Sequence, residues 1–224
     1  MAIIKSTMQT LTRQVIEEGL ANRVLSDAQL ARLIEGSPQR RHSLVNRAMK
    51  AGELLRLRRG NYVLDAQFRD YPLHPFALAQ AFVPGIYVSF ETALAHHGWI
   101  PEAVYTTACV TPGRKSSAYE HMLFGSFTFH PLAIQDGYFL ERVERQQIDH
   151  QTFLLASPMR ALMDLVCLRK TGWQGMDWLV EGLRIDYDLL RGMTGADIRT
   201  LASVYKQKRV KDFLKALAKE LGND

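Results

Sequence analysis

Side chains of the types that bind nucleic-acid bases and phosphates are concentrated in one short segment, residues 38–51. When this segment is drawn as a helix, its polar side carries Gln39, Arg40, Ser43, Asn46, Arg47 and Lys50, and Arg41 lies nearer the apolar side. Arginine can bond guanine through two hydrogen bonds, asparagine and glutamine can bond adenine, and lysine and serine suit phosphate oxygens. The polar side carries no carboxylate, whereas a typical solvated helix face mixes both signs of charge. The segment therefore predicts a helix that reads bases in a DNA major groove.

A basic hairpin is predicted directly after this helix. It carries Arg56, Arg58, Arg59 and Asn61. Leu55 and Leu57 alternate with arginines, which is the period of a half-buried strand, and the Gly-Asn pair at residues 60–61 favours a tight turn into a second strand over residues 62–64. Arginines at such a turn would lie along the DNA backbone or enter the minor groove. We therefore expect all four residues to contact DNA.

A second basic surface is predicted on the last helix, residues 204–221. Lys208, Lys211, Lys215 and Lys219 share one face of it at three- and four-residue steps, and Asp212 is expected off to the side. Like charges at this spacing destabilise a helix unless an anion is near. The pattern is compatible with an auxiliary phosphate contact and also with an ordinary solvated lysine face.

The elements that position these residues are predicted in the order of a winged helix-turn-helix. A first helix is expected over residues 7–18, and a second begins at Ser26, which forms a capping box with Gln29, and ends at Gly36. Ser37 followed by Pro38 predicts the start of the third helix, which is the DNA-reading helix. The two strands of the hairpin follow. We expect this DNA-binding domain to cover residues 1–68, with a proline-containing linker over residues 69–75.

The rest of the chain, residues 76–224, predicts a mixed α/β domain, so that the whole chain belongs to the α+β class. Helices are expected at residues 76–83, 89–98, from the Ser157-Pro158 pair to residue 168, 177–183 and 204–221, with Ser89 as a cap. Strands are expected at residues 86–88, 104–111, 124–129, 138–143 and 151–155.

The net charge is unevenly distributed. The chain of 224 residues has a formal charge of +5, yet residues 1–64 hold eleven Lys and Arg against five Asp and Glu, while the remainder holds seventeen against eighteen. The positive excess therefore lies entirely in the predicted DNA-binding domain, which favours an anionic partner for that part. With 47% hydrophobic and 23% charged residues, the composition excludes a disordered or low-complexity chain.

The sequence predicts a cytoplasmic protein. No run of about 20 uninterrupted apolar residues is present, so a membrane span is not expected. The N-terminus lacks the shape of a secretory signal. Cys109 and Cys167 have no metal-ligand spacing, and we interpret them as buried thiols in a reducing compartment.

No motif for catalysis or cofactor binding is present. The chain lacks a glycine-rich phosphate loop, a G-x-S-x-G elbow and a two-cysteine zinc pair. His96 and His97 are adjacent, so their side chains diverge on a helix and do not face one metal together. Asp136, Glu141 and Asp164 could build a metal-dependent nuclease centre, but their spacing does not single them out. We therefore expect no catalytic residue, no metal and no cofactor.

Four segments, in this order along the chain, resemble the AbiEi-type antitoxins. They are Arg-Gly-Asn-Tyr-Val-Leu at residues 59–64, Tyr-Val-Ser-Phe-Glu-Thr-Ala-Leu-Ala-His-His-Gly-Trp at 87–99, Val-Tyr-Thr-Thr-Ala-Cys-Val-Thr at 104–111 and Ala-Ser-Pro-Met-Arg-Ala-Leu-Met-Asp-Leu at 156–165. The similarity covers nearly the whole chain, and the segment 87–99 is its most specific part.

The resemblance implies an antitoxin and transcriptional autorepressor of a type IV toxin–antitoxin pair, linked to abortive phage infection. It implies that the N-terminal winged helix binds inverted repeats in double-stranded DNA. It also implies that the second domain counters a nucleotidyltransferase-like toxin without forming a stable complex, and that a basic surface of that domain helps to hold DNA. Family relatives also include stand-alone regulators without a toxin.

Two alternatives from other functional classes remain open at this point. The chain could be a DNA nuclease that the winged helix targets to its substrate. The winged helix could also be a protein-docking module, because many domains of this shape bind protein. We take the non-enzymatic autorepressor and antitoxin as the main hypothesis.

Overall fold

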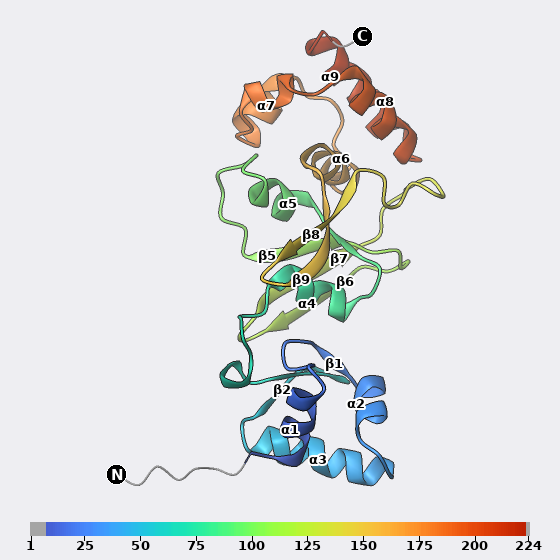
Figure 1. Cartoon of the computed structure of the whole chain (residues 1–224). Coiled ribbons are helices and arrows are strands. Elements are labelled where there is room, and N and C mark those ends of the chain that lie inside the picture. Colours follow the sequence, from blue (N-terminus) through green and yellow to red (C-terminus); the bar gives the residue numbers. More distant parts are fainter. Residues whose placement is uncertain (1–7, 223–224) are drawn as a thin grey trace. The chain divides into compact units, whose positions relative to one another are not determined.

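The computed structural model describes residues 8–222 of a chain that divides into two compact units, Met1–His74 and Pro75–Asp224. Both units combine helices with a β-sheet, so the protein is of the mixed α+β class (Figure 1). Each unit is described below by itself.

The N-terminal unit consists of short helices and a small antiparallel sheet with the strand order β1-β3-β2. Its elements are α1 (Thr10–Glu17), β1 (Leu25–Ser26), α2 (Asp27–Leu33), α3 (Pro38–Lys50), β2 (Leu54–Arg58), β3 (Asn61–Leu64) and a 3-10 turn over Ala66–Phe68. The third helix and the hairpin lie where they were predicted. The predicted start of the first helix at Thr7 lies outside the described residues. The short strand β1 was not predicted.

Local capping fixes the starts of α2 and α3. The Ser26 hydroxyl accepts a hydrogen bond from the Gln29 amide, and the Gln29 side chain accepts one from the Ser26 amide, which confirms the predicted capping box. Ser37 caps α3, and Pro38 occupies the first helical position. Helix α2 ends at Leu33, three residues before the predicted stop.

One hydrophobic core joins the helices of this unit to its sheet. The buried side chains include Leu11, Val15, Leu25, Leu30, Ile34, Leu44, Val45, Ala48, Leu54 and Leu64. Because α3 contributes Leu44, Val45 and Ala48 to this core, the side of the helix that bears the predicted DNA-contacting residues faces outward. The core thus determines which face of α3 is presented.

The C-terminal unit is built on a six-stranded mixed sheet with the order β6-β7-β5-β4-β9-β8. Its strands are β4 (Tyr87–Val88), β5 (Thr106–Val110), β6 (Ser117–His121), β7 (Gly125–His130), β8 (Val143–Ile148) and β9 (Gln151–Ala156). Its helices are α4 (Pro75–Phe82), α5 (Phe90–His96), α6 (Pro158–Arg169), α7 (Tyr187–Arg191), α8 (Gly195–Val204) and α9 (Lys208–Glu220), with a π-helical turn over Trp178–Gly182.

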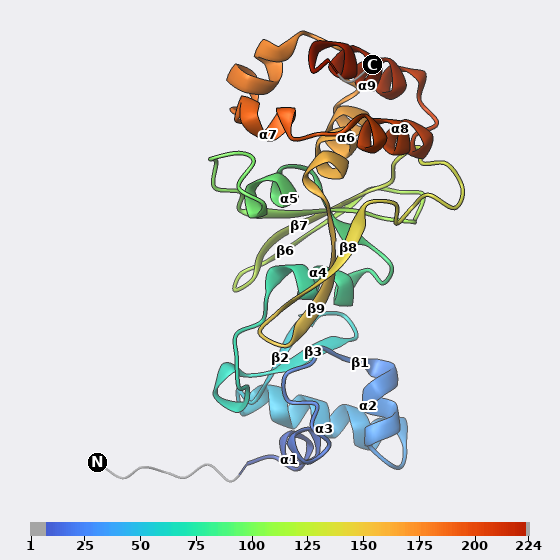
Figure 2. The ribbon, with the colours of Figure 1, turned by 45° about the horizontal axis from the view of Figure 1, so that its top comes forward.

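Helices cover both faces of this sheet. Helix α4 packs on one face, where Phe82 meets Phe127 edge to face with ring centroids 5.0 Å apart. Helices α5 and α6 lie on the other face, and α7, α8 and α9 gather beside α6 (Figures 1 and 2). Both cysteines are free and buried, and burial raises the pKa of the Cys167 thiol to about 11.

The structure of this unit differs from the sequence predictions in three places. The strand predicted over residues 138–143 is absent, because residues 139–142 form turns and strand β8 begins only at Val143. Strand β6 was missed. Residues 204–221 are not one helix, because α8 ends at Val204 and α9 starts at Lys208. In addition, Ser89 precedes α5 as predicted, but its hydroxyl makes no capping bond.

A buried polar network replaces that capping bond. The carboxylate of Asp164 accepts hydrogen bonds from Ser89 Oγ at 2.7 Å, Tyr87 Oη at 3.0 Å, Tyr205 Oη at 2.7 Å and Arg160 Nε at 2.9 Å. The side chains of Arg160 and Asp164 are fully buried. The network ties β4, α6 and the α8–α9 connection together, because each contributes a partner to one carboxylate.

Within residues 8–222, no helix is both long enough and apolar enough to cross a membrane.

Candidate nucleic-acid interface

The outer face of α3 presents a row of polar and cationic side chains. Gln39, Arg40, Ser43, Arg47 and Lys50 are exposed. Two further residues of the predicted set, Arg41 and Asn46, are half-buried at the margins of that face. Helix α3 contains no Asp or Glu, and its last turn holds two cations, so its surface is positively charged.

Hydrogen bonds to the backbone orient two of these arginines. The guanidinium of Arg40 donates to the Glu35 carbonyl at 3.1 Å, and the Arg40 amide donates to the Ser37 cap at 3.2 Å. Gly36, with a φ of +103°, allows the chain to turn under the Arg40 side chain. Arg47 Nε lies 3.4 Å from the Ser43 carbonyl, one turn earlier in the helix. Both arginines are thus partly ordered in the free protein.

The hairpin contains a β-bulge that the sequence pattern did not predict. Leu57 has no partner in the ladder, because Arg56 pairs with Tyr62 and Arg58 pairs with Asn61. The bulge places Leu54 and Leu57 in the core and leaves Leu55 half-buried. The prediction that Leu55 and Leu57 alternate with the arginines on one buried face was therefore wrong. The arginines of the hairpin are directed away from the core: Arg56 and Arg59 are exposed and Arg58 is half-buried.

Helix α2 holds the tip of the hairpin. The Asp27 amide donates to the Gly60 carbonyl at 2.9 Å. A Cβ at Gly60 would stand 2.9 Å from Asp27 Oδ2, and the φ of +78° there also favours glycine. The turn is therefore fixed against the start of α2.

Asn61 does not face outward as predicted. It is 8% exposed. With its carboxamide oriented to match its neighbours, the side-chain oxygen accepts hydrogen bonds from Arg58 Nε at 2.6 Å and Nη2 at 3.2 Å, and the amide nitrogen donates to the Gly60 carbonyl at 3.2 Å. Its hydrogen-bonding capacity is used inside the turn. Asn61 therefore holds the Arg58 guanidinium, and any contact of this pair with a ligand is made by Arg58.

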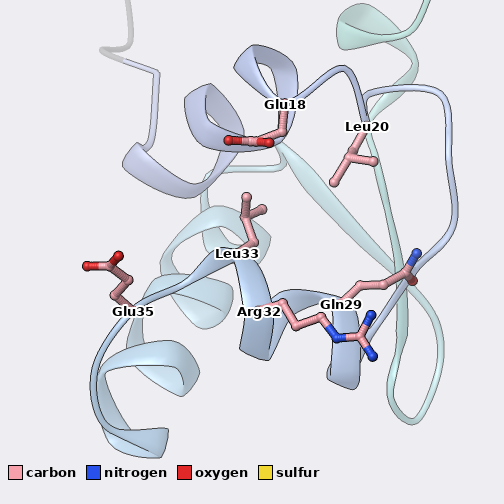
Figure 3. Close-up of a pocket in the computed structure, with 6 residues that line it drawn as sticks. All are labelled: Glu18, Leu20, Gln29, Arg32, Leu33 and Glu35. Atoms are coloured by element: carbon pink, nitrogen blue, oxygen red, sulfur yellow. The ribbon is translucent and has the colours of Figure 1, made fainter.

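This unit also contains a cleft of about 410 Å³ (Figure 3). It is lined by Glu18, Leu20, Gln29, Arg32, Leu33 and Glu35. In Figure 3 the carboxylates of Glu18 and Glu35 point to the side opposite the Arg32 guanidinium. No residue of the predicted DNA-contacting set lines this cleft, and its two carboxylates would repel phosphate. The cleft is thus not part of the cationic surface that α3 and the hairpin carry.

The lysine face of α9 is less basic than predicted. Lys208 Nζ lies 2.7 Å from Asp212 Oδ2, one helical turn away, so Asp212 belongs to the same face and was wrongly placed off to the side. Lys211 is half-buried, whereas Lys215 and Lys219 are exposed.

The residues considered for chemistry do not come together. Asp164 is fully committed to the buried network, Asp136 pairs with Lys206 at 3.0 Å, and Glu141 uses its carbonyl to accept from Arg160 at 2.6 Å. Across the described residues, no group of three His, Cys, Asp or Glu is arranged to hold a metal ion. His97 Nε2 lies 2.9 Å from the Ala156 carbonyl, and the His96 ring packs beside Phe76. The histidines thus have structural partners.

No protein-family model and no curated protein matches this chain.

Proposed function

We propose that the N-terminal unit is a winged helix-turn-helix and that the chain is a sequence-specific DNA-binding autorepressor. One observation carries the proposal: the outer face of α3 carries no carboxylate, and the hairpin that follows α3 in the same unit bears arginines that are exposed or half-buried. In this model α3 enters the major groove, and the hairpin follows the backbone or the adjacent minor groove.

In this proposal the polar residues of α3 divide into two roles. Gln39, Arg40, Ser43 and Arg47 lie toward the middle and the start of α3 and are placed to reach base edges. Asn46 and Lys50 flank them, with Lys50 on phosphate. On binding, Arg40 exchanges its backbone carbonyl acceptor for guanine or for a phosphate oxygen, and a bond to the charged phosphate is stronger than one to a neutral carbonyl.

Arg56, Arg58 and Arg59 supply the second contact, from the hairpin. Arg58 is held in place before binding, so less side-chain entropy is lost when it meets the DNA. An operator with inverted repeats would take two copies of the chain, one on each half-site, with the half-sites separated by whole turns of the duplex.

The antitoxin role rests on the resemblance to the AbiEi-type family. In this proposal the C-terminal unit counters a nucleotidyltransferase-like toxin without a stable complex, and exposed lysines of α9 add phosphate contacts. Co-expression of the chain with a nucleotidyltransferase-like reading frame from the same operon tests this role. Restored growth without co-purification of the two proteins is the expected result; a chain that leaves toxicity unchanged is a stand-alone regulator.

A mobility-shift titration tests DNA binding. The probe is the DNA directly upstream of the gene that encodes this chain, and the competitor is an unrelated duplex. Binding is measured at several salt concentrations. We expect preference for the upstream region and an affinity that falls steeply with salt. A protein that shifts neither duplex at low salt is a docking module, and the DNA-binding proposal then fails.

The nuclease alternative has its own test. The pure protein is incubated with supercoiled plasmid and Mg²⁺, and the plasmid is followed on a gel. If the protein is not an enzyme, the plasmid stays supercoiled. A nicking activity that elutes together with the folded protein would overturn this proposal.

A further inference from the structure

A cleft of about 460 Å³ opens on the sheet of the C-terminal unit, on the face that bears α5. Its lining comes from the start of α5, the end of α6, the loop before β5, and strands β5 and β7. Binding sites for small molecules are concave, mostly apolar, and carry a few polar groups, and their volumes run from roughly 300 to 1,000 Å³. The cleft has these properties.

Small side chains on two neighbouring strands create the floor of the cleft. Thr106 and Ala108 on β5 and Thr128 on β7 lie on the same face, with Ala108 and Thr128 directly paired across the parallel ladder. Residues of this size leave the sheet surface flat and open beside α5. A flat floor suits a planar ligand better than a branched one.

The wall formed by α5 is held rigidly. Phe90 is buried and has a φ of +57°, a conformation that is costly for a bulky residue and that persists only where its surroundings enforce it. The adjacent Thr92 hydroxyl donates to the Thr106 carbonyl at 2.7 Å and accepts from the Ala108 amide at 3.0 Å. These bonds fasten α5 to the edge of β5, so the cleft is preformed.

Aromatic and polar groups meet at one end of the cleft. The ring of His130 lies 5.7 Å from the ring of Phe90, nearly perpendicular to it. Burial lowers the pKa of His130, partly opposed by Glu91, so the imidazole is uncharged at pH 7. Glu91 is paired with Arg169. The carboxylate of Glu91 in the lining is thus balanced by Arg169, which lies next to the cleft, while hydroxyl and imidazole groups of the lining offer hydrogen bonds.

We propose that this cleft binds the base of a free nucleoside, as a flat, uncharged nitrogen heterocycle lying on Thr106, Ala108 and Thr128 with its polar edge toward His130. A heterocycle with several donors and acceptors on its edge satisfies the hydroxyls and the imidazole. A hydrocarbon ring would cover these groups without offering them hydrogen-bond partners, which costs the free energy of the bonds they make to water. Tyr105, which is 87% exposed at the rim, is placed to close over the ring.

Titration of the full-length protein with adenosine, guanosine, cytidine and uridine, in the absence of DNA, tests the proposal. Binding is followed by ligand-observed NMR and calorimetry. We expect at least one nucleoside to bind saturably, and indole, which has a single polar edge atom, to bind more weakly. If no nucleoside saturates the protein at millimolar concentration, or if indole binds more tightly than all four, the proposal is overturned.

Three substitutions locate the site. Ala108→Leu fills the floor and is expected to weaken binding by at least about tenfold, and His130→Phe keeps the ring but removes its nitrogens, with a loss of about two- to tenfold for one hydrogen bond. Thr128→Val keeps the shape of the side chain but removes its hydroxyl, and this variant tests the floor of the cleft if Ala108→Leu does not fold. The matched control is Thr152→Val on β9, outside the cleft. Unchanged binding in Ala108→Leu or Thr128→Val would place the ligand elsewhere.

This inference is independent of the proposed DNA binding. The nucleoside titrations contain no DNA, and mobility shifts of the same variants report on DNA binding alone. A wild-type protein that binds a nucleoside but no duplex would remove the DNA-binding proposal and leave the cleft assignment standing.

Discussion

Arg58 and Asn61 are cross-strand partners at the hairpin turn, and their side chains bond to each other. Asparagine in a Gly-Asn turn is usually exposed, so the residue type alone predicted a DNA contact. The bulge at Leu57 shifts the ladder and brings the carboxamide beneath the guanidinium. No sequence pattern marks a bulge at this position, so the pairing required the three-dimensional register.

Replacement of Asn61 by leucine is expected to weaken DNA binding through Arg58. The variant loses the acceptor that orients the guanidinium, so its operator affinity falls by about the same factor as that of Arg58→Ala. The double variant shows no further loss, because both changes remove one contact. Mobility-shift titrations of the single and double variants measure this coupling. Arg59→Ala is the control, and its effect should add to that of Asn61→Leu; additivity with Arg58→Ala instead would contradict the positioning role.

Arg47 and Lys50 are both exposed on α3, but we expect different losses from their removal. Arg47→Ala should lower operator affinity by about 1–3 kcal/mol and relax the preference at one base pair. Lys50→Ala should weaken all duplexes alike and reduce the salt slope by about one unit, because a phosphate contact releases one counterion fewer. Titrations on the operator and on an unrelated duplex at several salt concentrations separate the two. Equal losses on both duplexes for Arg47→Ala would mean that it contacts phosphate only.

At the level of elements, the starts of helices that have a local cap could be predicted from the sequence, whereas polar strands at the edge of the sheet could not. At Ser26, Ser37 and Ser157 the serine hydroxyl accepts a hydrogen bond from the backbone amide three residues later, so the local sequence contains the information for each cap. Strand β8 reads Val-Glu-Arg-Gln-Gln-Ile and lies at the edge of the sheet, where one face needs no apolar residue. Its pairing with β9 forms the strand despite the absence of an alternating pattern.

The cap of α3 is expected to contribute to the stability of the N-terminal unit. Ser37→Ala removes the acceptor for the Arg40 amide and should lower the free energy of unfolding of that unit by about 1 kcal/mol. Urea unfolding followed by circular dichroism measures this. The equivalent change at the start of α6, Ser157→Ala, serves as the matched comparison and should act on the C-terminal unit. A Ser37→Ala variant as stable as wild type would show that Pro38 alone suffices to begin the helix.

Helix α9 offers a test of its proposed phosphate contacts. Asp212 neutralises Lys208, so Asp212→Asn frees one lysine and adds one net positive charge to that face. We expect higher affinity for DNA at low salt and a salt slope steeper by about one unit. Glu220→Gln changes the net charge equally on the same helix and controls for charge alone. If both variants bind DNA as wild type does, α9 is a solvated surface.

At the level of the whole molecule, tertiary partners decide what the sequence left open. Asp164 was one acid among many, yet it accepts hydrogen bonds from residues 40 to 80 positions away in the sequence. Arg160 holds the carbonyl of Glu141 and so keeps residues 139–142 as turns rather than the predicted strand. Such long-range contacts have no local signature, which is why this segment and the break before α9 were mispredicted.

Two buried tyrosines and two partly desolvated histidines set the pH range over which the protein is most stable. Burial, together with the Asp164 charge, raises the pKa of Tyr87 and of Tyr205 well above 10, so the folded state keeps both protons when the unfolded chain loses them. Stability should therefore fall as the pH rises above about 10. Burial lowers the pKa of His96 and His130, so the unfolded chain binds protons first, and stability should also fall as the pH drops below about 6.5.

Unfolding by urea at a series of pH values checks both limbs of this profile. Tyr205→Phe removes one titrating phenol, and in this variant the alkaline loss of stability should be shallower than in wild type, even though the lost hydrogen bond to Asp164 lowers the stability at pH 7. His130→Phe should flatten the acidic limb in the same way and leave the alkaline limb unchanged. A Tyr205→Phe variant whose stability falls above pH 10 as steeply as that of wild type would show that this phenol titrates as it does in the unfolded chain, and the network around Asp164 would then not hold its proton.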